Sequence, residues 1–195
     1  MIETRPDWCV SRQRVWGVPL PIFINKKTGE ILIDDEVFDN IAKIYEKEGS
    51  DCWFSDDPQK FLGKKYKAED FEKLSDIVEV WFDSGSTHSF VLEKRKDLKW
   101  PASMYLEGSD QHRGWFHSSL LESCGTRDRA PFESILSHGF VVDGKGLKMS
   151  KSLGNVIAPE DILKKYGADI LRIWVASSNY AEDLRIDYSI LDQHA

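Results

Sequence analysis

Two short apolar stretches flank one helix-length segment in the second half of the chain, and their spacing constrains the fold more than any other feature. Residues 103–106 are predicted to form a strand, residues 111–124 a helix that ends at Gly125, and residues 135–142 a second, buried strand. Two strands joined through a helix by short connections pack as a right-handed parallel unit. The sequence therefore predicts an α/β fold in which ligands bind beyond the carboxyl ends of the strands.

The chain before this unit divides into two parts. Residues 1–25 contain two prolines close to their end, which forbid a helix there and predict an irregular, well-packed segment. Residues 34–49 carry apolar side chains at helical spacing, with an aspartate as the N-cap and a glycine as the stop. Residues 50–75 are rich in Asp, Lys and Gly around isolated aromatics. We interpret residues 26–75 as a small α+β insertion.

Further elements are predicted on either side of the parallel unit. Residues 77–82 form a strand-like run that ends in a turn cluster of Asp, Ser and Gly. Pro159 suits the first turn of a helix, which is predicted to stop at Gly167. The apolar spacing over residues 170–175 indicates another short helix.

Charge and cysteine content limit the classes of function. Among 195 residues, 26 are basic and 33 acidic, a net charge of −7, so nucleic acid could be held only by a local patch. The three cysteines form no Cys-x-x-Cys pair, which favours neither a disulfide framework nor a zinc site and fits a reducing cytosol. No apolar run approaches membrane-spanning length. We expect a cytoplasmic protein with no membrane contact and no metal site.

Polar side chains follow the first predicted strand of the parallel unit. Glu107 and Asp110 are acceptors suited to an ammonium group or to ribose hydroxyls, and Gln111 can both donate and accept. The alternative is that Ser109 or Asp110 caps the following helix while Glu107 is solvated. Two tryptophans could line a ligand pocket here. For Trp81 the local pattern fits core packing as well as it fits a pocket, and for Trp115 it fits core packing better.

A polar loop with three lysines follows the second predicted strand, over residues 144–155. Lysine is a compact positive charge on a flexible stem, and a pair delivered by a closing loop can neutralise charge that develops on phosphate during a reaction. A solvated surface loop is the alternative on charge alone.

The order of residues in this loop carries a resemblance. Residues 148–152 read Lys-Met-Ser-Lys-Ser, the KMSKS signature of class I aminoacyl-tRNA synthetases. Residues 8–19, 80–88 and 105–116 resemble the isoleucyl branch of that family, in its order and in its bacterial or organellar form. The resemblance spans nearly the whole chain and is weakest over the insertion.

The resemblance implies an activity and its partners. The family activates isoleucine with ATP, together with Mg²⁺, to isoleucyl adenylate, and then transfers the acyl group to tRNA(Ile) in translation. Two alternatives stay open. One is a valyl- or leucyl-tRNA synthetase fragment, and the other is a non-catalytic module, derived from a synthetase, that binds tRNA or a partner protein.

The resemblance also assigns roles on the amino-acid side of the site. Two indoles, Trp81 and Trp115, would line the pocket for the amino-acid side chain, which reverses the expectation of core packing. Four residues at the end of the first predicted strand would hold the aminoacyl-adenylate: Glu107, Gly108, Asp110 and Gln111.

On the nucleotide side, the resemblance implies that the backbone of Phe140 and Val141 lies against adenine. Lys148 and Lys151 would be the catalytic residues that contact the triphosphate, with Lys151 the better candidate for charge in the transition state.

The chain contains no His-x-Gly-His sequence, which the family carries on the first half of its nucleotide-binding domain. The resemblance therefore implies a fragment that is inactive by itself. We expect residues 1–25 and 76–157 to form the second half of a Rossmann-type parallel nucleotide-binding fold with the KMSKS loop. Residues 26–75 would be the insertion, and residues 158–195 the first helices of a stem-contact region.

Overall fold

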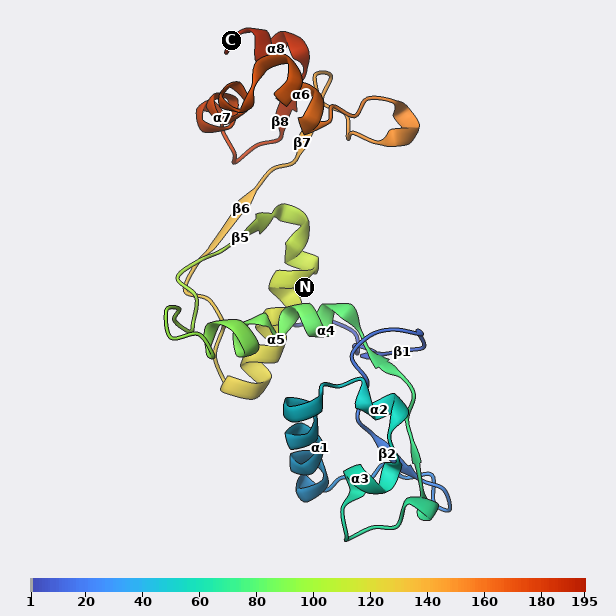
Figure 1. Cartoon of the computed structure of the whole chain (residues 1–195). Helices are drawn as coiled ribbons and strands as arrows, with labels where there is room; N and C mark the ends of the chain where they lie inside the picture. The colour runs from blue at the N-terminus through green and yellow to red at the C-terminus, as the bar shows by residue number, and fades with distance from the viewer. Residues whose placement is uncertain (1) are drawn as a thin grey trace.

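Short helices and strands group into three units along an elongated molecule, with the segment from β2 to β3 at one end and the C-terminal unit at the other (Figure 1). The computed structural model describes residues 2–195. These residues form four sheets of two strands each. Two of the sheets are antiparallel and the other two are parallel. No helix in the described residues is long and apolar enough to cross a membrane.

The first unit is the insertion. Its elements are β2 (Phe23–Asn25), α1 (Asp35–Glu48), α2 (Cys52–Ser55), α3 (Pro58–Leu62), the 3₁₀ turn η1 (Ala68–Asp70) and β3 (Phe71–Lys73). The predicted helix is confirmed as α1, because Asp34 accepts hydrogen bonds from two backbone amides of its first turn and Gly49 ends it with a φ of 83°. The antiparallel pairing of β2 with β3 puts Phe23 in the core of this unit, so the compact body starts before residue 26.

The second unit contains the predicted parallel pair. Its elements are β1 (Ser11–Arg12), β4 (Ile77–Val78), α4 (Val80–Gly85), the π-helical turn η2 (His88–Leu92), β5 (Tyr105–Gly108), η3 (Ser109–Arg113), α5 (Trp115–Arg127) and β6 (Ile135–His138). β5 and β6 pair in parallel, with Tyr105 opposite Ile135 and Gly108 opposite His138. The α/β expectation of two parallel strands joined through a helix is confirmed.

The predicted strand over residues 77–82 is wrong beyond Val78. Glu79 accepts a hydrogen bond from the backbone N–H of Trp81 and caps α4, which packs against α5. Trp81 therefore lies on a helix and not at a strand end. The apolar run was too short to distinguish a strand from a buried helical turn.

Two other boundaries also differ from the sequence prediction. The predicted strand over residues 135–142 is two strands, because the chain leaves β6 at Gly139, whose backbone N–H donates to Tyr180 O at 2.9 Å. The predicted helix over residues 111–124 is the 3₁₀ turn η3 followed by α5. α5 passes through Gly125 and ends at Asp128, which adopts the left-handed conformation with a φ of 55°.

The third unit joins the KMSKS loop to the C-terminal helices. Its elements are β7 (Val141–Asp143), η4 (Lys151–Leu153), α6 (Pro159–Tyr166), α7 (Ala168–Ser177), β8 (Leu184–Ile186) and α8 (Tyr188–Asp192). β7 and β8 pair in parallel. Met149 and Ile157 pack on a core that contains Ile162 and Trp174, so the loop belongs to this unit and not to the β5–β6 pair. Both predicted helices of this region are confirmed.

Candidate active site

One pocket lies where β5 ends and α5 begins. It encloses about 370 Å³ and is lined by Trp81, Ser84, Thr87, Glu107, Gln111 and Trp115. Four of these six residues are ones that the sequence placed on the amino-acid side of the site. The structure thus brings together residues that are separated by up to 34 positions in the chain.

Trp115 is held in one orientation at this pocket. Its ring stacks on Tyr105 with centroids 4.2 Å apart and planes 11° apart. Its Nε1 donates to Ser84 O at 2.9 Å, and its backbone N–H donates to Gln111 Oε1 at 2.9 Å. A half-buried indole with a satisfied N–H presents a rigid apolar face, which is what recognition of an apolar side chain requires.

Trp81 approaches the pocket from α4 with 41% of its surface exposed. A Cβ added at Gly114 would lie 3.1 Å from Trp81 Cη2 and 2.6 Å from Gln111 Oε1. A larger residue at position 114 would therefore displace the Gln111 amide and press on the indole of Trp81.

The polar edge of the pocket continues toward β6. Gln111 Nε2 donates to Asp110 Oδ2 at 3.1 Å. A Cβ at the buried Gly108 would lie 2.8 Å from Asp110 Oδ1 and 3.7 Å from Phe140 Cε1. The backbone of Gly108 thus lies close to both the carboxylate of Asp110 and the ring of Phe140.

A second pocket of about 500 Å³ lies along β7. It is lined by Phe140, Val141, Val142, Gly146, Lys148, Met149 and Asp183. Phe140, Val141 and Lys148 were placed on the nucleotide side by the sequence. Asp183 Oδ1 accepts a hydrogen bond from Phe140 N at 2.8 Å and fixes the backbone there.

The structure does not bring Lys151 to this pocket. Its side chain is exposed on η4, outside the lining residues. A contact between Lys151 and a phosphate at Lys148 would therefore need the loop to move, as catalytic loops do when they close on a substrate.

Six of the lining residues were not among the predicted site residues: Ser84 and Thr87 in the first pocket, and Val142, Gly146, Met149 and Asp183 in the second. Ser84 and Thr87 lie within a segment quoted for the resemblance, one and two turns after Trp81, and that spacing could have indicated them. Asp183 lies more than forty positions after Phe140, and no local signal indicated their contact.

A half-buried acid lies between α4 and α5, where its carboxyl group approaches Gly85. Glu122 Oε1 is shielded from solvent and has no hydrogen-bond partner. Burial, with a further contribution from nearby Asp83, raises the pKa of Glu122 to about 8. Burial, together with Glu79, also raises the pKa of Asp83. At neutral pH the Glu122 carboxyl is thus mostly protonated, and two helices can pack there without two adjacent negative charges.

The described residues, 2–195, contain no group of three or more His, Cys, Asp or Glu side chains arranged to hold a metal ion.

A parallel strand pair with an indole-walled pocket where β5 ends, and a second pocket along β7 beside the lysine loop, defines an α/β protein with candidate ligand sites at the ends of its strands. Residues 1–187 match the family described as tRNA synthetases class I (I, L, M and V), and the chain belongs to this family. The family predicted from the KMSKS signature is thereby confirmed.

Curated relatives carry the name isoleucine–tRNA ligase. The protein of Pelagibacter ubique is 89% identical over 100% of this chain and 22% of its own length. Those of Caldicellulosiruptor saccharolyticus and Zymomonas mobilis are 58% and 57% identical over 99% and 98% of this chain. The chain spans about a fifth of the length of these relatives, 22%, 22% and 20%.

Solved structures of the same class share the fold. A ternary complex of Agrobacterium radiobacter K84 agnB2 LeuRS with tRNA and LeuAMS matches 95% of this chain and 26% of that chain, with a TM-score of 0.68 and 23% identity. A Mycobacterium tuberculosis methionyl-tRNA synthetase in complex with methionyl-adenylate matches 87% of this chain and 39% of that chain, with a TM-score of 0.51 and 16% identity.

Proposed function

We propose that the chain is the part of a bacterial isoleucine–tRNA ligase that carries the KMSKS loop. Such an enzyme activates isoleucine with ATP and transfers the isoleucyl group to tRNA(Ile). One observation carries the proposal: Trp81, Glu107, Gln111 and Trp115 line a single pocket, and Phe140, Val141 and Lys148 line a second one. The identity of 89% with an isoleucine–tRNA ligase supports the choice of amino acid.

The first pocket suits isoleucine. The indoles of Trp81 and Trp115 form apolar walls for the branched side chain, and the Glu107 carboxylate stands at the edge, where an ammonium group would bind. Hydrogen bonds from Trp115 to Ser84 and Gln111 hold one wall in place before substrate arrives.

The second pocket suits the nucleotide. The backbone of Phe140 and Val141 would lie against adenine, and Asp110 with Gln111 would accept ribose hydroxyls. In the proposed reaction a carboxylate oxygen of isoleucine attacks the α-phosphorus of ATP, and pyrophosphate leaves. Lys148 and Lys151 would stabilise the negative charge on the phosphate oxygens, with Mg²⁺ entering as part of the ATP substrate.

In the second step a hydroxyl of the terminal tRNA ribose attacks the carbonyl carbon of the adenylate, and AMP leaves. We propose that residues 1–25 and 76–157 form the second half of a Rossmann-type nucleotide-binding fold. Residues 26–75 form the insertion, and residues 158–195 begin the stem-contact region. The His-x-Gly-His sequence, absent from the chain, would lie elsewhere in a longer polypeptide. An enzyme of translation would act in the cytoplasm.

The test is ATP–pyrophosphate exchange. The full-length gene product that contains this chain should exchange label with isoleucine and much less with valine or leucine, while the isolated 195-residue chain should not. Preference for valine or leucine would reassign the amino acid. No amino-acid-dependent exchange by the full-length protein would favour a non-catalytic binding module.

A further inference from the structure

Two side chains close the base of the lysine loop. Asp143 is the last residue of β7, and Asn155 lies 12 positions later, before α6. Asn155 Nδ2 donates to Asp143 Oδ2 at 2.8 Å. Both residues are half-buried, whereas the lysines between them are exposed.

The Asp143 carboxylate also shapes the first half of the loop. Its Oδ1 accepts hydrogen bonds from Lys145 N at 2.9 Å and from Leu147 N at 2.8 Å. The backbone N–H of Asp143 in turn donates to Leu147 O at 2.9 Å. The chain is therefore fixed up to the residue before Lys148.

Asn155 fixes the part of the loop that carries Lys148. Its Oδ1 accepts from Ser150 N at 2.9 Å, and its Nδ2 donates to Lys148 O at 3.2 Å. The side-chain amide thus uses its acceptor and both of its donors. Aspartate at position 155 could not supply the donors, and asparagine at position 143 would turn a donor toward Asn155 or toward the loop amides.

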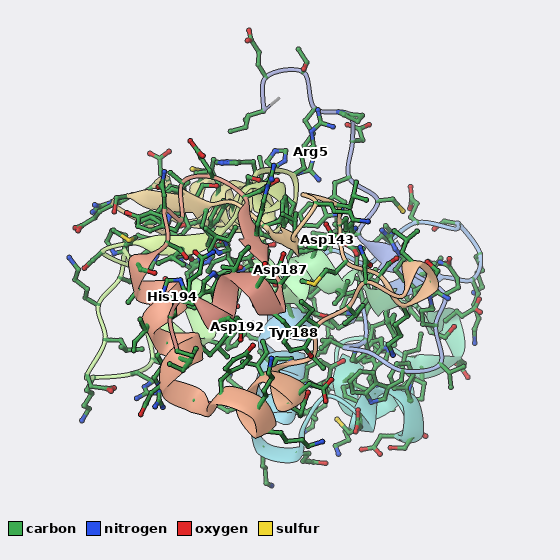
Figure 2. The ribbon with its side chains drawn as sticks, turned by 90° about the horizontal axis from the view of Figure 1, so that it is seen from above. Arg5, Asp143, Asp187, Tyr188, Asp192 and His194 are labelled. Carbon is green, nitrogen blue, oxygen red and sulfur yellow. The ribbon has the colours of Figure 1, made fainter. Side chains whose placement is uncertain are left out.

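The base of the loop is seated on the C-terminal unit. The Cα of Gly144 lies against the carboxylate of Asp187, which caps α8 by accepting from Ile190 N at 2.8 Å. Figure 2 shows Asp143 and Asp187 close together in the view from above. A Cβ at Gly146 would lie 3.4 Å from Arg185 Nη2, so β8 also borders the loop.

We propose that Asp143 and Asn155 are positioning residues that hold the backbone of Lys148 and Ser150, and thereby aim Lys148 at the phosphates of ATP. The proposal rests on the proposed function for its substrate, but the pairing itself can be tested without activity. Because the pair acts on Lys148 and lies outside the isoleucine pocket, its loss should slow adenylate formation and leave isoleucine binding unchanged.

The first experiment is a swap of the two side chains in the full-length enzyme. Asp143→Asn and Asn155→Asp should each lower kcat of exchange by about 10- to 100-fold, with the KM for isoleucine within about twofold of wild type. Asn155→Asp also places two carboxylates side by side and should be the worse variant. In the double variant an amide donor at position 143 again faces a carboxylate acceptor at position 155, so its kcat should be about tenfold higher than that of Asn155→Asp.

Asp169→Asn is the matched control, because Asp169 is exposed on α7 and pairs with Arg172 at the surface. Its kcat should equal that of wild type. The proposal would be overturned if the fold-loss in kcat of the double variant equalled the product of the losses of the two single variants. A KM for isoleucine that rises as much as kcat falls would overturn it as well.

The second experiment measures amide hydrogen exchange of residues 144–155 in the same proteins. Both single variants should exchange faster there, while residues 35–48 of α1 stay unchanged. If the wild type shows no isoleucine-dependent activity, the proposed function fails, and loop protection still decides the pairing. If activity is present but both single variants keep wild-type protection, the pairing fails and the proposed function stands.

Discussion

The insertion and the pocket face of the second unit are both built from aromatic side chains, yet they use them in opposite ways. Trp53 is 0% exposed, packs on Phe23 and Phe61 with ring centroids 5.1 and 5.0 Å away, and donates its Nε1–H to Leu74 O. Trp81 is 41% exposed and borders a pocket. An aromatic ring thus serves as core where other rings surround it and as a binding wall where one face is left open.

The two regions also differ in how their acidic side chains are hydrogen-bonded and in the direction of the pKa shifts. In the insertion, Asp34 receives hydrogen bonds from Lys65 and Tyr66, which lower the pKa of Asp34 to about 2. In the second unit, Glu122 is half-buried, its shielded Oε1 has no hydrogen-bond partner, and its pKa is raised to about 8. Asp34 is thus satisfied by its neighbours in the insertion, whereas the Glu122 carboxyl in the pocket unit is not.

The largest effect expected is on the insertion. Trp53→Ala removes a fully buried ring and should lower the free energy of unfolding by about 3–5 kcal/mol. Urea unfolding followed by circular dichroism measures this loss. Phe54→Ala is the control, because Phe54 is 46% exposed and should cost less than about 1 kcal/mol. Equal losses for the two variants would break the comparison.

Next in size is the effect of Lys151→Ala on chemistry. The substitution should slow adenylate formation in the full-length enzyme by about 100- to 1000-fold, because it removes charge stabilisation present only in the transition state. Rapid-quench measurement of isoleucyl adenylate tests this, with Lys145→Ala, an exposed lysine of the same loop, as the control. A matching rise in the KM for isoleucine would contradict the role.

Trp81→Ala should separate binding from stability. It should raise the KM for isoleucine by about 10- to 100-fold while lowering the free energy of unfolding by less than about 1 kcal/mol, because the ring is partly solvated already. Phe90→Ala, at a residue 57% exposed and outside the pocket lining, should change neither quantity. A stability loss as large as that of Trp53→Ala would assign Trp81 to the core.

The smallest effect concerns pH. Folding raises the pKa of Glu122 from 4.5 to about 8. The protonated carboxyl therefore contributes its full stabilisation below pH 4.5, and this contribution is lost as the pH rises to about 8. Glu122→Gln should remove this loss and stabilise the protein at pH 8 by about 1 kcal/mol once solvent screening is allowed for. Asp34 has the opposite sign, since its contribution is present above pH 3.8 and is lost as pH falls toward 2.

Thermal unfolding of wild type and Glu122→Gln between pH 5 and pH 9 measures the difference. The two curves should run together at pH 5 and separate at pH 8. Parallel curves over the whole range would show that Glu122 is ionised in the folded protein.

Elements with short-range signals were predictable from sequence. The N-cap of α1 and the glycine after α6 act within a few residues of the helix they bound, and both helices end where predicted. The helix at residues 80–85 and the break at Gly139 were not predictable, because contacts with α5 and with residues 180–182 decide them. Those contacts depend on the tertiary fold.

The candidate site shows the same division. The local sequence pattern favoured a core role for Trp115, and the stacking of its ring on Tyr105 agrees with that role. The family resemblance predicted a pocket at Trp115, and the residue also lines the first pocket. The roles of the lysines and of Glu107 stay predictions. The partner of Asp143 across the loop and the buried carboxyl of Glu122 depend on distances that no sequence pattern encodes.

The most direct measurement is a crystal structure of the full-length enzyme with a non-hydrolysable analogue of isoleucyl adenylate. The account predicts that the isoleucine side chain lies between Trp81 and Trp115, the ammonium group beside Glu107, and adenine against the backbone of residues 140–141. An analogue bound away from both indoles and from Glu107 would contradict it.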